Sequence, residues 1–157
     1  MSGMRGWWAV SAGVAIMVLP SLAGPVSASS YTWTLMCRVG GDFPGGARAS
    51  WDWLQDGQVI GGAGGTGYCG EGGSGDRPAN ADGVTVSLLA QAYVPGLGGG
   101  FKIVTRDVTK SFDPADGFQL TLHASASIAA KVCSFGDLVT SCDVQHSSVH
   151  ARFTMTG

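Results

Sequence analysis

The segment Phe118–Val132, FQLTLHASASIAAKV, alternates apolar and polar side chains with one exception, Ala129. A period of two places successive side chains on opposite faces of a strand, whereas a helix needs a period of 3.6. The segment therefore predicts a long β-strand with one dry and one wet face. The dry face would carry Phe118, Leu120, Leu122, Ala124, Ala126, Ile128, Ala130 and Val132.

The same alternation appears on both sides of this segment. It predicts further strands over 31–39, 47–53, 58–60, 84–94, 101–108 and 149–155. Asp56-Gly57 is a strong hairpin signal between two of them, and no segment after residue 28 shows a sustained helical period. About seven or eight antiparallel strands of this kind predict an all-β domain. We expect an antiparallel β-sandwich of jelly-roll or immunoglobulin-like type, with a small closed β-barrel as the alternative.

The first 28 residues have the composition of an export signal. Arg5 is their only charged side chain, and the apolar run Trp7–Leu19 follows it. That run has the length of a signal h-region and is shorter than a membrane span, and Val26-Ser27-Ala28 fits a cleavage site. We expect a signal peptide over 1–28, cleaved after Ala28, and a single secreted domain over 29–157. Retention of the signal as an N-terminal anchor is the alternative.

Four cysteines follow the signal: Cys37, Cys69, Cys133 and Cys142. An even number in an exported chain indicates two disulfides, for which three pairings are possible. We favour Cys37–Cys69 and Cys133–Cys142, because the second pair flanks a turn-like segment and would face across a hairpin. A structural zinc site is disfavoured, since no Cys-x-x-Cys occurs. No metal is expected.

The charge balance argues against a nucleic-acid partner. Without Arg5 the chain has eight basic residues (9 − 1) and 11 acidic ones, a net charge of −3. Lysine is scarce and no basic run occurs, whereas nucleic-acid binding needs clustered Lys and Arg. We expect an extracellular protein or a glycan as the partner, and no membrane span in the cleaved chain.

Two short motifs match ligand-binding patterns but lack the required context. Gly62–Gly67 fits G-x-G-x-x-G, yet the residues after it are poor helix formers, so no helix N-terminus would hold a pyrophosphate. Asn80–Gly83 resembles the middle of a calcium loop, but Pro78 and Leu89 stand where that loop needs carboxylates. Turn formation explains Asp82-Gly83 without a metal. We therefore expect no cofactor.

Catalytic groups are sparse in this sequence. His146 and His150 are four residues apart, about 13 Å on a regular strand, which is too far for a shared metal. Glu71 is the only glutamate, and no G-x-S-x-G occurs. We expect no catalytic residues. A small secreted hydrolase with a Ser–His–Asp set assembled in space is a less favoured alternative.

Glycine-rich stretches and aromatic residues provide the remaining hypothesis. Gly40–Gly46 and Gly61–Gly83 are expected to be connections, the second a long loop held by Cys69. Trp51 and Trp53 project side by side from one strand face, where they would either stack on sugar rings or pack in the core. The predicted ligand contacts are Trp51, Trp53, Tyr68, Phe43 and Asp42.

The function predicted from these features is binding. We expect a secreted extracellular or cell-envelope binding or structural domain that does not catalyse a reaction. The alternative is a secreted inhibitor of an extracellular hydrolase, which would present a rigid loop near Cys69.

Overall fold

The computed structural model describes residues 29–96, 99–113, 117–135 and 140–157. The predicted export signal, residues 1–28, lies outside the described residues. Within the described ranges, no helix has the length and apolarity needed to cross a membrane.

The described residues form eight strands in two antiparallel sheets, which confirms the predicted β-sandwich. One sheet has the order β4-β1-β8-β7 and the other has the order β3-β2-β5-β6. No strand pairing joins the two sheets within the described residues, so the alternative of a closed barrel is wrong. The strands are β1 (Ser30–Gly41), β2 (Gly46–Gln55), β3 (Gln58–Tyr68), β4 (Glu71–Asp76), β5 (Gly83–Val94), β6 (Gly100–Ser111), β7 (Gln119–Phe135) and β8 (Thr140–Thr156).

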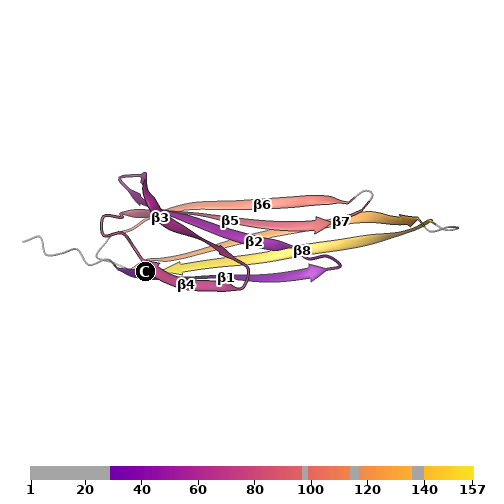
Figure 1. Ribbon diagram of the computed structural model, residues 1–157, viewed down its shortest axis with the longest axis horizontal. Coiled ribbons are helices and arrows are strands. Elements are labelled where there is room, and N and C mark those ends of the chain that lie inside the picture. The colour runs from indigo at the N-terminus through magenta and orange to yellow at the C-terminus, as the bar shows by residue number, and fades with distance from the viewer. Residues whose placement is uncertain (1–28, 97–98, 114–116, 136–139) are drawn as a thin grey trace, which may run out of the picture.

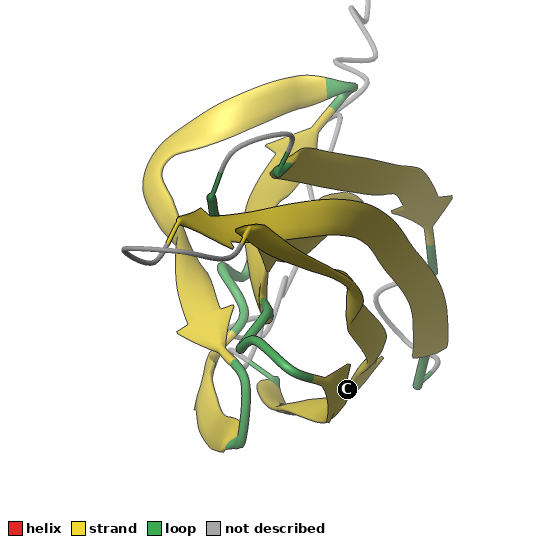
Figure 2. Ribbon diagram, turned by 90° about the vertical axis from the view of Figure 1, so that its right-hand side faces the viewer, coloured by secondary structure: helices red, strands yellow, loops and turns green. Residues whose placement is uncertain are grey.

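The chain passes between the sheets four times, after β1, β3, β4 and β6. Hairpins join β2 to β3, β5 to β6 and β7 to β8, and the predicted Asp56-Gly57 turn joins the first pair with positive φ at both residues (52° and 74°). The molecule is elongated, and the β7–β8 hairpin extends past the other strands at one end (Figure 1). Viewed along the long axis, the strands curve around a common interior (Figure 2).

The core is built from the alternating faces that the sequence predicts. Even-numbered residues of β5 and the apolar set of β7 point inward, where they meet large aromatic side chains from the neighbouring strands. Trp51 links several of these rings: its indole Nε1 donates a hydrogen bond of 3.2 Å to Tyr31 Oη, and its ring lies 4.9 Å from that of Trp33. These aromatic contacts join β1 to β2 and hence one sheet to the other.

The expected loop over Gly61–Gly83 is mostly strand, so that prediction is wrong. β3 continues to Tyr68, and β4 begins three residues later. The glycines of β3 are explained by steric contacts with the core. A Cβ placed on Gly65 would overlap the Trp51 ring, and one on Gly67 would overlap the Trp33 ring. Glycines at inward positions of β3 leave space in which the tryptophans lie directly against the backbone.

Gly67→Ala tests this explanation of the glycine-rich strand. The new methyl group would displace the Trp33 ring, so we expect the free energy of unfolding to fall by about 1–3 kcal/mol. Gly61→Ala is the matched control on the same strand, because no atom lies within 4 Å of its added Cβ. Urea unfolding followed by circular dichroism measures both variants. Equal stability of Gly67→Ala and Gly61→Ala would contradict the close packing.

Both predicted disulfides are present. Cys37–Cys69 joins β1 to the turn between β3 and β4, and Cys133–Cys142 joins directly paired residues of β7 and β8. The first bridge fixes the corner at which the chain leaves one sheet for the other. The second closes the end of the projecting hairpin.

Candidate functional site

The two tryptophans predicted to contact a ligand lie in the core. Trp51 is 3% exposed and Trp53 is 1% exposed. A sugar ring cannot stack on a side chain that is covered on all sides, so the prediction is wrong for these two residues. The two tryptophans do share one face of their strand, as predicted, but that face is the inner one, which meets the other sheet.

Asp42 and Phe43 form part of a tight connection between β1 and β2. The Asp42 carboxylate accepts a hydrogen bond of 2.8 Å from the backbone N–H of His146, and the Phe43 carbonyl accepts one of 3.2 Å from the buried Ser147 hydroxyl. The Ser147 hydroxyl also accepts a bond from the Tyr93 N–H. The polar groups of this connection therefore hold β1, β5 and β8 together.

Tyr68 is the predicted contact residue that lies on an open surface. Its side chain is 55% exposed at the end of β3, on the outer face of the β3-β2-β5-β6 sheet. The register places Arg48 beside it and Leu89 beyond Arg48. On the next strand, Phe101 (64% exposed) and Ile103 (55% exposed) point to the same side.

These residues form one continuous surface, which we call the aromatic face. The Tyr93 and Phe101 rings stack at one end of it, with their centroids 4.4 Å apart. The Cα atom of Tyr68 lies about 16 Å from that of Tyr93, because the two residues are separated by two strand spacings across the sheet and by four residues along it. The aromatic face comprises Arg48, Tyr68, Leu89, Gln91, Tyr93, Phe101 and Ile103.

Two shallow hollows lie on the aromatic face. One, of about 380 Å³, is lined by Arg48, Tyr68, Leu89 and Gln91 together with the start of β2. The other, of about 270 Å³, lies beside the stacked Tyr93 and Phe101 rings. The first combines apolar surface with the guanidinium of Arg48 and the amide of Gln91, so it can both stack against a ligand and form hydrogen bonds with it.

The outward orientation of Phe101 and Ile103 follows from an inverted pattern in β6. The register turns Lys102, Arg106 and Lys110 toward the side of the sandwich interior, although all three remain exposed at the sheet edge. Charged residues that point inward on an edge strand protect it from pairing with other chains. Phe101 and Ile103 are then left on the outer surface, whereas Val104 packs against the core.

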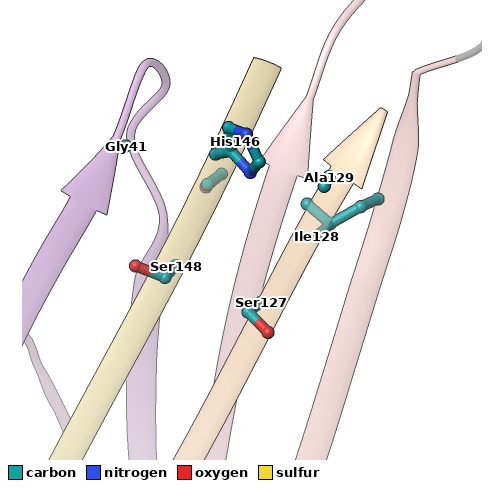
Figure 3. Close-up of a pocket in the computed structure, with 7 residues that line it drawn as sticks. Gly41, Ser127, Ile128, Ala129, His146 and Ser148 are labelled. Carbon is teal, nitrogen blue, oxygen red and sulfur yellow. The ribbon is translucent and has the colours of Figure 1, made fainter. Parts of the chain in front are cut away.

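A third hollow, of about 310 Å³, lies across β8 and β7 and contains a histidine and serines. Figure 3 shows His146 beside its paired residue Ala129, with Ser127 and Ser148 further along the two strands. The Ser148 hydroxyl donates to the Gly40 carbonyl, and the Ser127 hydroxyl points away from the His146 ring (Figure 3). The hollow therefore does not pair a serine nucleophile with a base.

One serine and one histidine do meet elsewhere on the same sheet. Ser125 Oγ lies 2.9 Å from His150 Nδ1 on the open outer surface. Acyl transfer by such a pair needs a carboxylate that orients the imidazole. The residue paired with His150 on the other side is Arg38, a cation. The serine–histidine pair is therefore flanked by a cation and not by the carboxylate that a Ser–His–Asp set requires.

The remaining sequence hypotheses concern metals and known families. Within the described residues, no three His, Cys, Asp or Glu side chains are grouped to hold a metal ion. Comparison with protein-family models, with curated proteins and with solved structures found no significant match.

Proposed function

We propose that this chain is a secreted, non-catalytic binding domain whose aromatic face contacts a neutral polysaccharide. The observation that carries the proposal is the exposure of Tyr68, Phe101 and Ile103 on one side of a sheet. Single exposed apolar residues are common, but several gathered on one surface mark a binding site. Residues 1–28 would direct export, and the two disulfides suit an oxidising compartment.

A polysaccharide fits the chemistry of this face better than a purely apolar ligand. Aromatic rings stack on the apolar side of a sugar, while Arg48 and Gln91 supply hydrogen-bonding groups for its hydroxyls. The spacing of about 16 Å between Tyr68 and Tyr93 suits an extended chain more than a single sugar.

The rival function, inhibition of a hydrolase through a loop near Cys69, has less support. The turn at Cys69-Gly70 is short and lies against β1, with the Gly70 N–H donating to the Leu35 carbonyl at 2.8 Å. Glu71 then closes the turn by accepting from the Tyr68 N–H at 2.7 Å. A segment held in this way does not project into the cleft of another protein.

Affinity electrophoresis tests the proposal by measuring how far a polysaccharide in the gel retards the chain. The probes are cellulose derivatives, xylan, chitin oligomers and mixed-linkage glucan. We expect at least one probe to retard the chain, and Tyr68→Ala and Phe101→Ala each to weaken its binding about tenfold. Val59→Ala is the control, because Val59 is also exposed on this sheet but lies outside the aromatic face. Binding to none of the probes, or equal loss in Val59→Ala, would overturn the proposal.

A further inference from the structure

The outer face of the β4-β1-β8-β7 sheet carries a cluster of basic side chains. In one row across the strands, Arg38 pairs with His150 and His150 pairs with Ser125. In the adjacent row, Met36 pairs with Arg152 and Arg152 pairs with His123. His146 and Lys131 lie further toward the end of the hairpin on the same face. We call the block Arg38, His123, His150 and Arg152 the basic face.

No carboxylate of the described chain forms an ion pair with this block. Asp76 is on the same side by register, but its partner Ser30 is eight residues from Arg38 along β1, about 26 Å. Asp42 and Glu71 lie at the borders, and each carboxylate already accepts a backbone N–H. Neither Arg38 nor Arg152 forms an ion pair with a residue that the structure describes.

This segregation is unusual for a chain with more acidic than basic residues. Arg38 and Arg152 are diagonal neighbours on adjacent strands, with their Cα atoms about 7–8 Å apart. Like charges at this spacing repel each other in the unliganded protein. An oxyanion between the two guanidinium groups would remove the repulsion, and each arginine can bind it through two parallel N–H groups.

The surroundings of the basic face are rich in hydroxyl groups. The rows next to Arg152 carry threonines from three strands, and Thr32 Oγ1 and Thr156 Oγ1 are 2.8 Å apart. Hydroxyls and guanidinium groups both donate hydrogen bonds to oxygen acceptors. The threonines are Thr32, Thr34, Thr121, Thr154 and Thr156.

We propose that the basic face binds an acidic polysaccharide, with its sulfate groups held between Arg38 and Arg152. A membrane is a poorer match, because Met36 is the large apolar side chain exposed within the block and no aromatic residue accompanies it. A nucleic acid is also a poorer match, because the basic face carries no Phe, Tyr or Trp for base stacking, only the imidazoles of His123 and His150, and no element of it enters a groove. The proposal does not depend on the aromatic face, which belongs to the other sheet.

Dextran sulfate is the probe, with uncharged dextran of the same length as its control. We expect the chain to bind dextran sulfate at about 50 mM NaCl and to lose most of that binding at about 500 mM NaCl. It should not bind uncharged dextran. Arg38→Gln/Arg152→Gln should weaken binding about a hundredfold, from about a factor of ten for each charge-assisted contact. Arg106→Gln, an exposed arginine of β6, removes charge elsewhere and should change the affinity less than about twofold.

Thermal unfolding separates a binding role from a structural one. Because the double variant removes a repulsion, its melting temperature should equal or exceed that of the parent chain. Equal loss of binding in Arg106→Gln, or no binding of dextran sulfate, would overturn the proposal. Tighter binding to phosphatidylserine vesicles or to duplex DNA at the same salt concentration would overturn it as well. Tyr68→Ala should bind dextran sulfate normally, which keeps this test distinct from that of the aromatic face.

Discussion

Replacing Trp53 with alanine is expected to lower the free energy of unfolding by about 3–5 kcal/mol. Trp53 is 1% exposed and lies between the two sheets. Its ring is 5.0 Å from that of Tyr31 in β1 and 6.0 Å from that of Phe118 at the start of the segment that leads into β7. Truncation would leave a large cavity at the point where these elements meet, and a rigid sandwich can close it only in part.

Urea unfolding followed by circular dichroism measures this loss. Trp53→Phe should lose less, because it keeps an aromatic ring in part of the space. Val59→Ala is the exposed control and should change stability by less than about 0.5 kcal/mol. A loss below about 1 kcal/mol for Trp53→Ala would show that this residue is not part of a packed core.

Removing the Cys37–Cys69 bridge is expected to cost about 3–4 kcal/mol, from the entropy of a closed loop with a sequence separation of 32. The Cys133–Cys142 bridge closes a separation of only 9, for which the same relation gives about 2.5 kcal/mol. The first bridge also fixes the corner that brings β4 beside β1. Its loss should therefore act on both sheets, whereas loss of the second acts on one hairpin.

The comparison uses Cys37→Ala/Cys69→Ala and Cys133→Ala/Cys142→Ala, each unfolded in urea without reductant. We expect the free energy of unfolding of Cys37→Ala/Cys69→Ala to be about 1 kcal/mol lower than that of Cys133→Ala/Cys142→Ala. Hydrogen exchange should be faster for the β4 amides in Cys37→Ala/Cys69→Ala and for the amides at the end of the β7–β8 hairpin in Cys133→Ala/Cys142→Ala. The reverse order of stability would mean that native contacts, and not loop entropy, set the difference.

Side-chain alternation predicted most of this fold. β1, β2, β5, β7 and β8 mostly alternate apolar and polar residues, with exceptions such as Met36 and Val144, and the favoured cysteine pairing rested on the turn-like segment between Cys133 and Cys142. β4 could not be found in this way, because four of its six residues are glycine or serine and provide no apolar face. One signal was present: glycines recur at every second position from Gly65 to Gly67 and from Gly73 to Gly75, as close aromatic packing requires.

The candidate site was harder to predict than the fold. Trp51 and Trp53 mark a strand face, but alternation does not tell which face of a sheet meets the other sheet. For the same reason, the outward orientation of Phe101 and Ile103 could not be predicted. Their strand turns its lysines and arginine toward the sandwich edge. The basic face depends on register between strands far apart in sequence, since Arg38 and His150 are brought together only by the β1–β8 pairing.

The two disulfides also decide how the protein responds to proteases. Each bridge closes a covalent ring, one from residue 37 to 69 and one from 133 to 142. A single peptide-bond cut inside either ring leaves both fragments attached, so a nicked molecule keeps its full mass and its strands stay within reach of their partners. The first ring contains β2 and β3. A single cut in that region would therefore separate no fragment until a second cut or a reductant released it.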